Sequence, residues 1–197
     1  RRQRQMCIRD RYVSAMMLAV SMMFLRFMIL ILIFSTSIFL NIYPYLLIMS
    51  ATAAGIGIFI HKKHTIKGER EVIEETETES NPLEFKVALI FALLFVVFTF
   101  LTHYTLVYAG TGGLSILSIA TGLSDITPFI LNLLQGGNIP ATIVGACIMQ
   151  AIISNIVVNM FYAIFFSSRR KEMLPYVWKG FLTVIGVNAV LLLIYYF

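Results

Sequence analysis

The sequence has few charged residues and few cysteines. Charged side chains make up 13% of its 197 residues and hydrophobic ones 59%, whereas an average soluble domain is roughly 25% charged. This balance excludes an ordinary soluble enzyme. It also excludes a disordered chain, because so much apolar surface cannot stay in water. The two cysteines, Cys7 and Cys147, are too few for a disulfide framework or a metal-ligand spacing.

The sequence motifs of catalysis are missing as well. The chain has no phosphate-binding Gly-Lys-Ser/Thr loop, no HExxH zinc motif and no nucleophile elbow. No hydrophilic stretch is long enough to form an ATPase domain. We therefore expect a protein that is not an enzyme and uses no cofactor, and the sequence leaves the identity of any bound metal open.

What the sequence has instead is a series of apolar runs, each long enough to cross a bilayer as a helix of about 20 residues. Their apolar content is nearly continuous, which favours helices over the alternating strands of a β-barrel. We predict an all-α, polytopic integral membrane bundle that lies in a lipid bilayer. Its six hydrophobic segments are residues 13–34, 42–60, 87–108, 114–134, 141–166 and 177–197.

The net charge of +5 is concentrated at the start of the chain. Residues 1–11, RRQRQMCIRDR, hold five arginines and one aspartate and do not begin with Met. They resemble the translated adapter sequence that recurs at the ends of metagenome-derived reading frames. We predict that they are a non-native tag and that the native protein begins further upstream. The alternative is a short basic cytoplasmic tail. Without these residues, the charge gives no reason to expect a nucleic-acid partner.

The rest of the chain divides into three parts. Residues 12–60 hold the first two transmembrane helices, residues 61–81 form a charged linker, and residues 82–197 hold four further hydrophobic segments. Basic residues cluster in the linker and again at 169–171. The positive-inside rule places both clusters on the cytoplasmic side, which requires an even number of crossings between them. The fourth segment is the natural candidate for not crossing, which leaves five crossings.

The fourth segment contains helix-stop and helix-start signals close together. Gly122 can end a first half-helix in the left-handed conformation. Thr127 is a good N-cap for a second half-helix, with Pro128 at its first position. We predict a broken helix or a re-entrant hairpin, and such backbone survives at membrane depth only where protein buries it or it lines a cavity. The alternative is one helix kinked at Pro128.

Two charges of opposite sign lie inside the hydrophobic segments, Arg26 in the first and Asp125 in the break. Each would cost about 2.5–3.5 kcal/mol facing lipid, so both are expected to face protein or water. One hypothesis is a paired site that binds a cation, a proton or an anionic substrate, with Thr127 and Asn155 as neutral ligands. The second is a structural salt bridge. In the third, Arg26 extends to an interface while Asp125 caps a half-helix.

The fifth segment carries polar residues in an otherwise apolar helix, among them Gln150, Asn155 and Asn159. Asn155 and Asn159 are four positions apart and share a helix face. Such side chains either line a path or hold helices together by hydrogen bonds. We include Gln150, Asn155 and Asn159 in the candidate ion or substrate site.

The order of these signals resembles the membrane domain at the C-terminus of MgtC/SapB-type proteins, the domain of unknown function 4010 family. The matching motifs are MFLR at 23–26, NPLE at 81–84, GLSDI at 122–126, PFIL at 128–131, SN at 154–155 and KGF at 179–181. The family often has a second acidic residue where Thr127 stands and a lysine where Asn159 stands. These departures argue against a mechanism that needs two carboxylates.

The resemblance implies a multi-pass protein of the bacterial inner membrane. Its full-length parent would carry an N-terminal MgtC-like domain and be linked to magnesium homeostasis. Two functions stay open. The first is a transporter or ion-pathway domain for a small solute or for a cation, magnesium- or proton-linked. The alternative is a non-transporting interaction or regulatory protein, in which the Arg26–Asp125 pair is structural. A homo-oligomer is compatible with both.

Overall fold

The computed structural model describes residues 2–64, 83–136, 139–167 and 174–196, and the regular secondary structure in these ranges is entirely helical. The six helices are α1 (Arg2–Phe34), α2 (Thr36–His64), α3 (Leu83–Thr121), α4 (Thr127–Gln135), α5 (Ala141–Ser167) and α6 (Leu174–Tyr196). Five of them, all except α4, are long and apolar enough to cross a membrane. The prediction of an all-helical membrane protein is confirmed in this form.

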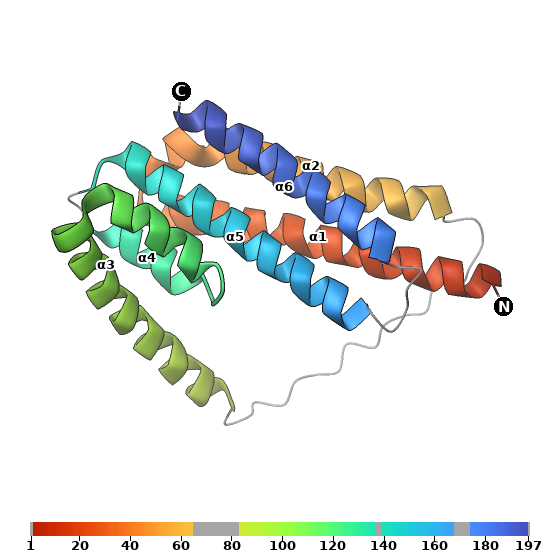
Figure 1. Ribbon diagram of the computed structural model, residues 1–197, viewed down its shortest axis with the longest axis horizontal. Coiled ribbons are helices and arrows are strands. Elements are labelled where there is room, and N and C mark those ends of the chain that lie inside the picture. The colour runs from red at the N-terminus through yellow and green to blue at the C-terminus, as the bar shows by residue number, and fades with distance from the viewer. Residues whose placement is uncertain (1, 65–82, 137–138, 168–173, 197) are drawn as a thin grey trace.

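Helices α1 and α2 form an antiparallel pair, and α5 and α6 pack across it (Figure 1). Only Ser35 separates α1 from α2, and its hydroxyl accepts the N–H of Ile38 at 3.4 Å. The two helices approach closely, because Gly57 has no side chain and the Ser14 hydroxyl donates to its carbonyl at 2.7 Å. Small residues permit this kind of contact between membrane helices.

The predicted boundary between the third and fourth hydrophobic segments, residues 109–113, coincides with a bend at Gly110 inside one long helix. An apolar stretch of 34 residues runs from Ala88 to Thr121 within α3, and the helix changes direction at Gly110, where φ is 58° and ψ is −152° (Figure 1). A glycine at positive φ turns the chain within one residue, so helical geometry resumes at once. The predicted segment 114–134 is therefore divided between the end of α3 and the nine-residue α4.

The start of α1 also differs from the prediction. The helix begins at Arg2 and runs through the proposed tag, while its membrane-spanning part begins at Val13 as predicted. A helical backbone is compatible with either origin of residues 1–11, so the tag stays a prediction. Most of the predicted linker, residues 65–81, lies outside the described ranges.

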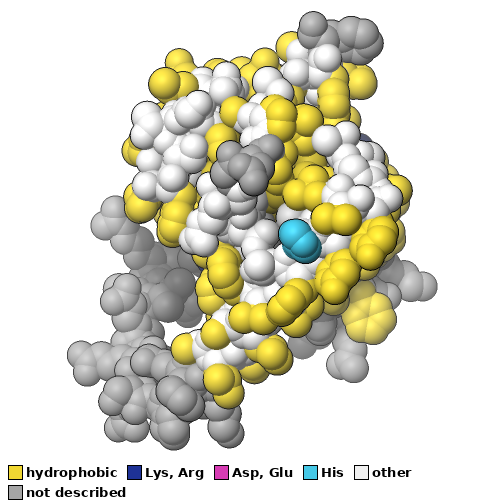
Figure 2. Space-filling model, turned by 90° about the vertical axis from the view of Figure 1, so that its left-hand side faces the viewer, with side chains coloured by type: hydrophobic (Ala, Val, Ile, Leu, Met, Phe, Trp, Pro, Cys, Tyr) yellow, Lys and Arg dark blue, Asp and Glu magenta, His cyan; other side chains and the backbone are white. Residues whose placement is uncertain are grey.

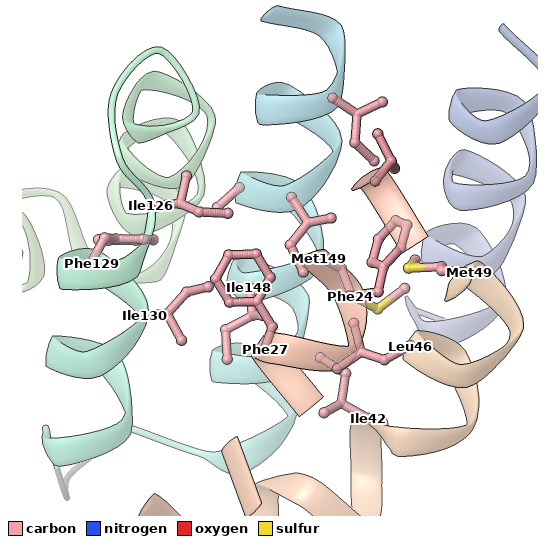
Figure 3. Packing of buried hydrophobic residues seen from close by; sticks show 14 of the residues in the cluster. Phe24, Phe27, Ile42, Leu46, Met49, Ile126, Phe129, Ile130, Ile148 and Met149 are labelled. Atoms are coloured by element: carbon pink, nitrogen blue, oxygen red, sulfur yellow. The ribbon is translucent and has the colours of Figure 1, made fainter. Parts of the chain in front are cut away.

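The hydrophobic core lies around α1. Figure 3 shows Phe24 and Phe27 of this helix between side chains of α2 on one side and side chains of α4 and α5 on the other. These neighbours include Ile42, Leu46, Met49, Ile130, Ile148 and Met149. Through this packing, the part of α1 around Phe24 and Phe27 is held against the start of α4.

The outer surface is apolar too, with large side chains such as Ile33 and Ile116 each 72% exposed. Hydrophobic and uncharged atoms make up nearly all of the described surface at the end of the molecule where α3 bends (Figure 2). A soluble monomer rarely exposes apolar surface on this scale, so the bilayer is the solvent that this exterior fits.

Candidate functional site

The candidate site begins at the break between α3 and α4. Helix α3 ends in three tight turns, in which the N–H groups of Gly122, Leu123 and Ser124 each donate to the carbonyl three residues earlier, at 3.0–3.3 Å. These turns end the helix without a left-handed residue. The predicted left-handed conformation at Gly122 is therefore wrong, and Gly110 is the positive-φ glycine of the described residues.

The start of α4 differs from the prediction by one position. Ile126 is the N-cap, so Thr127 is the first helical residue and Pro128 the second. The capping acceptor comes from the residue before Ile126, because the Asp125 carboxylate accepts the backbone N–H of Thr127 at 2.9 Å. Thr127 is thereby freed from the capping role that the sequence predicted for it.

Thr127 connects the two charges that lie within the hydrophobic segments. Its hydroxyl donates to Asp125 Oδ1 at 2.7 Å and accepts a hydrogen bond from Arg26 Nη2 at 3.1 Å. A hydroxyl can donate and accept at once, so it relays between a cation and an anion. The structure gives no ion pair between Arg26 and Asp125, and the expected direct pair is replaced by this three-residue relay.

The relay is buried at its centre and open at its ends. Thr127 is 4% exposed, whereas the side chains of Arg26 and Asp125 are exposed at the protein surface. Arg26 lies about 20 Å along α1 from Val13 and about 12 Å from Phe34, at a rise of about 1.5 Å per residue. The two charged groups therefore stand near the middle of the α1 span.

The break is fixed against α5 by Gly122. A Cβ at this position would overlap the Ser154 side chain and lie 2.8 Å from the Asn155 nitrogen. The Ser154 hydroxyl donates to the carbonyl of Ile119 at 2.7 Å, and Asn155 Nδ2 donates to that of Gly122 at 3.3 Å. The bond from Asn155 satisfies the Gly122 carbonyl past the end of α3, and the bond from Ser154 is a second one to the Ile119 carbonyl, which also accepts the Gly122 N–H.

The other predicted site residues lie at increasing distance from this relay. Asn159 Nδ2 donates to Asn155 Oδ1 at 3.1 Å and reaches the break only through that neighbour. Gln150 accepts from the Ser118 hydroxyl at 2.8 Å and donates to the Tyr196 hydroxyl at 3.0 Å, so it links α3, α5 and α6. The structure thus brings Arg26, Thr127 and Asp125 together and places Gln150 in a separate contact.

Sequence reasoning missed a second group of polar residues, Thr99, Thr102, Asn132 and Gln135, which line a cleft between α3 and α4. The available signal was the spacing of Thr99, Thr102 and His103, which places three polar side chains on one face of an apolar helix. For metal binding, the described residues contain no group of three or more His, Cys, Asp or Glu side chains.

The chain is similar to proteins whose activity is not described. The sequence profile of a family described as a domain of unknown function (DUF4010) matches residues 1–167. An uncharacterized protein of Aquifex aeolicus is 24% identical over 153 residues, which are 76% of this chain and 63% of that protein. This chain thus spans less than two thirds of the length of that relative. No solved structure gives a significant match.

Proposed function

The chain belongs to the family described as a domain of unknown function (DUF4010), and from this premise we propose that it is a transporter or ion-pathway domain. The solute is a cation, with magnesium or proton linkage, or another small solute. Asp125 is the proposed binding carboxylate, Arg26 its counter-charge, and Thr127 and Asn155 are neutral ligands. Asn159 and Gln150 belong to the polar lining of α5. The proposed activity is transport, not enzymatic catalysis.

The observation that carries this proposal is the exposure of Arg26 and Asp125 near mid-span. Each charge would cost about 2.5–3.5 kcal/mol at the centre of a bilayer if it faced lipid. Their link through Thr127 lowers that cost but leaves both side chains open at the protein surface. A water-filled path that reaches the break supplies the missing solvation, and discontinuous helices build the binding sites of many secondary transporters.

We further propose that the end of α3 and α4 form a re-entrant hairpin. Residues 111–121 extend about 16 Å and α4 about 14 Å, each about half of a hydrocarbon core of about 30 Å. Between them the break contacts Ser154, which lies about 20 Å from Ala141 and about 17 Å from Phe165 along α5. A hairpin whose tip reaches the middle of the bilayer accounts for the lengths of residues 111–121 and of α4.

The direction of the helices supports five crossings. The ends of α2 and α5 and the start of α6 lie at one end of the bundle, and the bend in α3 lies at the other (Figure 1). Lys62 and Lys63 of the first basic cluster lie in the last turn of α2, and the basic residues at 169–171 follow α5 in the sequence. Both clusters then lie on one side, which the positive-inside rule makes cytoplasmic in the bacterial inner membrane.

One observation favours the alternative, a non-transporting interaction or regulatory protein in which the relay is structural. Only 11% of the apolar window of α3 is buried, against 33–50% for the other four spans. A helix with so few neighbours is available to another chain. Candidate partners are a second copy and an N-terminal MgtC-like domain in the parent protein, and the MgtC/SapB resemblance supports the latter together with a role in magnesium homeostasis.

The test compares Asp125→Asn, Arg26→Gln and the double variant with the unchanged full-length protein in liposomes. Flux of Mg²⁺ and of protons is measured beside thermal stability in detergent, and Ser124→Ala is the control at the same break. The transport proposal predicts that each single variant loses most flux and keeps its stability. If the single variants retain flux but unfold early, and the double variant recovers stability, the relay is structural and the alternative replaces the proposal.

A further inference from the structure

A cleft of about 630 Å³ lies between α3 and the C-terminal half of α4. It extends from Thr111, Gly136 and Pro140, near the bend in α3, to Thr99, which is about 16 Å from Gly110 along the helix. The relay of Arg26, Thr127 and Asp125 adjoins the opposite end of α4. The cleft is therefore a different place in the fold from the proposed transport site.

One residue that lines the cleft, Thr102, carries a buried hydroxyl without a partner in the described part of the chain. Thr102 is 4% exposed, and its Oγ1 has no hydrogen bond within the described part of the chain. Threonines in helices commonly bond to a carbonyl of their own helix, as Thr99 does to Phe95 at 2.8 Å. A buried polar group without a hydrogen-bond partner costs free energy, so a hydroxyl of this kind beside a cleft points to a ligand.

The neighbouring groups supply further oxygen atoms. Asn132 Nδ2 donates to Thr99 Oγ1 at 2.6 Å, which orients the amide, and Oδ1 of the same amide has no bond within the described ranges. Helix α4 ends at Gln135, with Gly136 as its C-cap. The last carbonyls of a helix lack helical partners and carry partial negative charge, so they add to the electronegative character of the cleft.

The composition of the lining decides the class of ligand. Among the described residues that line the cleft there is no Lys, Arg, Asp, Glu, Tyr or Cys, and His103 is the one ionisable side chain. Without a basic group, the oxygens repel an anion. Without a carboxylate, they do not neutralise a divalent cation. Neutral hydroxyl, amide and carbonyl oxygens at the C-terminal end of a half-helix suit a monovalent metal ion.

We propose that this cleft binds a monovalent metal cation, with Thr102 Oγ1, Asn132 Oδ1 and carbonyl oxygens at the end of α4 as its protein ligands. The volume leaves room for water molecules in the remainder of the coordination shell. This site does not include Asp125. The protein would therefore bind a monovalent ion in the cleft in addition to the solute proposed to bind at the relay.

The experiment measures thermal unfolding of the full-length protein in detergent, with NaCl or KCl titrated against choline chloride at constant ionic strength. A ligand that binds only the folded protein raises Tm as it saturates the site. Thr102→Val keeps the shape and removes the hydroxyl. We expect it to raise the half-saturating Na⁺ or K⁺ concentration about tenfold or more, the size of effect expected from one lost polar ligand.

Thr105→Val is the matched control, because Thr105 is on the same helix but outside the cleft. It should keep the unchanged protein's half-saturating concentration. The proposal is overturned if neither ion raises Tm, or if Thr102→Val and Thr105→Val respond alike. Asp125→Asn should keep the full ion-dependent rise, so a failed transport site and a failed cation site are separable.

Discussion

At the scale of single residues, Thr127 is the centre of the candidate site. It carries the hydrogen bond from Arg26 and the one to Asp125, and it is 4% exposed while both partners are exposed. Neither charge therefore depends on the other directly. A single buried hydroxyl sets the distance between a guanidinium and a carboxylate, and both of its hydrogen bonds are to charged groups, which are stronger than bonds between neutral groups.

Thr127→Val removes this hydroxyl without changing the volume of the side chain. We expect a loss of about 1–3 kcal/mol in stability, since two charge-assisted hydrogen bonds are lost, and a fall in flux if the relay serves transport. Thr127→Ser should retain both properties. Unfolding in detergent and flux in liposomes are measured together.

Thr52→Val is the control for the Thr127 variants, because the Thr52 hydroxyl bonds only within its own helix, to Met49 at 2.8 Å. It should cost less than Thr127→Val in both assays. If Thr52→Val and Thr127→Val lose equal stability and equal flux, the relay contributes no more than an ordinary hydrogen bond within a helix.

At the scale of elements, the position of the break depends on a helix crossing. Gly122 lets the end of α3 lie directly against Ser154 and Asn155 of α5, and two hydrogen bonds from α5 hold it there. Ile126 caps α4 without a side-chain bond, so α4 takes its start from Asp125 and Pro128. The end of α3 and the start of α4 are thus fixed by contacts with α5 and with Asp125 as much as by their own helix signals.

Gly122→Ala tests this crossing. The added methyl group overlaps the Ser154 side chain, and we expect a destabilisation of about 1–3 kcal/mol, the usual cost of overpacking. Gly55→Ala is the matched control, because nothing lies within 4 Å of its added Cβ. The measurement is detergent unfolding.

A second variant separates overpacking from other effects at Gly122. Ser154→Gly removes the side-chain overlap but also the hydrogen bond to Ile119, so Gly122→Ala is compared with Ser154→Gly alone. In that background Gly122→Ala should cost less stability than in the unchanged protein, although the contact with the Asn155 backbone nitrogen remains. An equal cost in both backgrounds would mean that the helix crossing is not what requires a glycine here.

At the scale of the whole molecule, the arrangement follows from which helices cross. Five spans with the proposed hairpin would place the two basic clusters on one side, whereas six crossings would separate them. The same choice decides whether the break lies at the tip of a hairpin or within a continuous span. It also decides from which side the cleft between α3 and α4 is entered.

Cysteine labelling from one side of the membrane checks this topology. Lys62→Cys and Lys179→Cys, each made without Cys7 and Cys147, should react with an impermeant reagent from the same side, and Gly136→Cys from the other. This pattern follows if α3 and α5 cross and the hairpin does not. Reaction of the Lys62 and Lys179 positions from opposite sides would establish six crossings.

The sequence by itself determined the class of fold and most of the spans. Continuous apolar runs of bilayer length allow only helices or closed barrels, and the lack of alternation selects helices. The spans 13–34 and 141–165 were predicted to within one residue of those found. The two charges within the membrane segments were also visible in the sequence, because any charge stands out in a run of apolar residues.

Only the tertiary structure decided that α3 bends at Gly110 without a loop, what Thr127 does and which polar residues meet. Gly110 and Gly122 look alike as sequence signals, but their conformations depend on the packing around them. Thr127 has the sequence signature of a cap, yet the neighbouring Asp125 takes that role and Arg26, from a distant helix, takes the hydroxyl. Hydrophobic periodicity records which residues are apolar, but contacts between residues a hundred positions apart are fixed by how the helices pack.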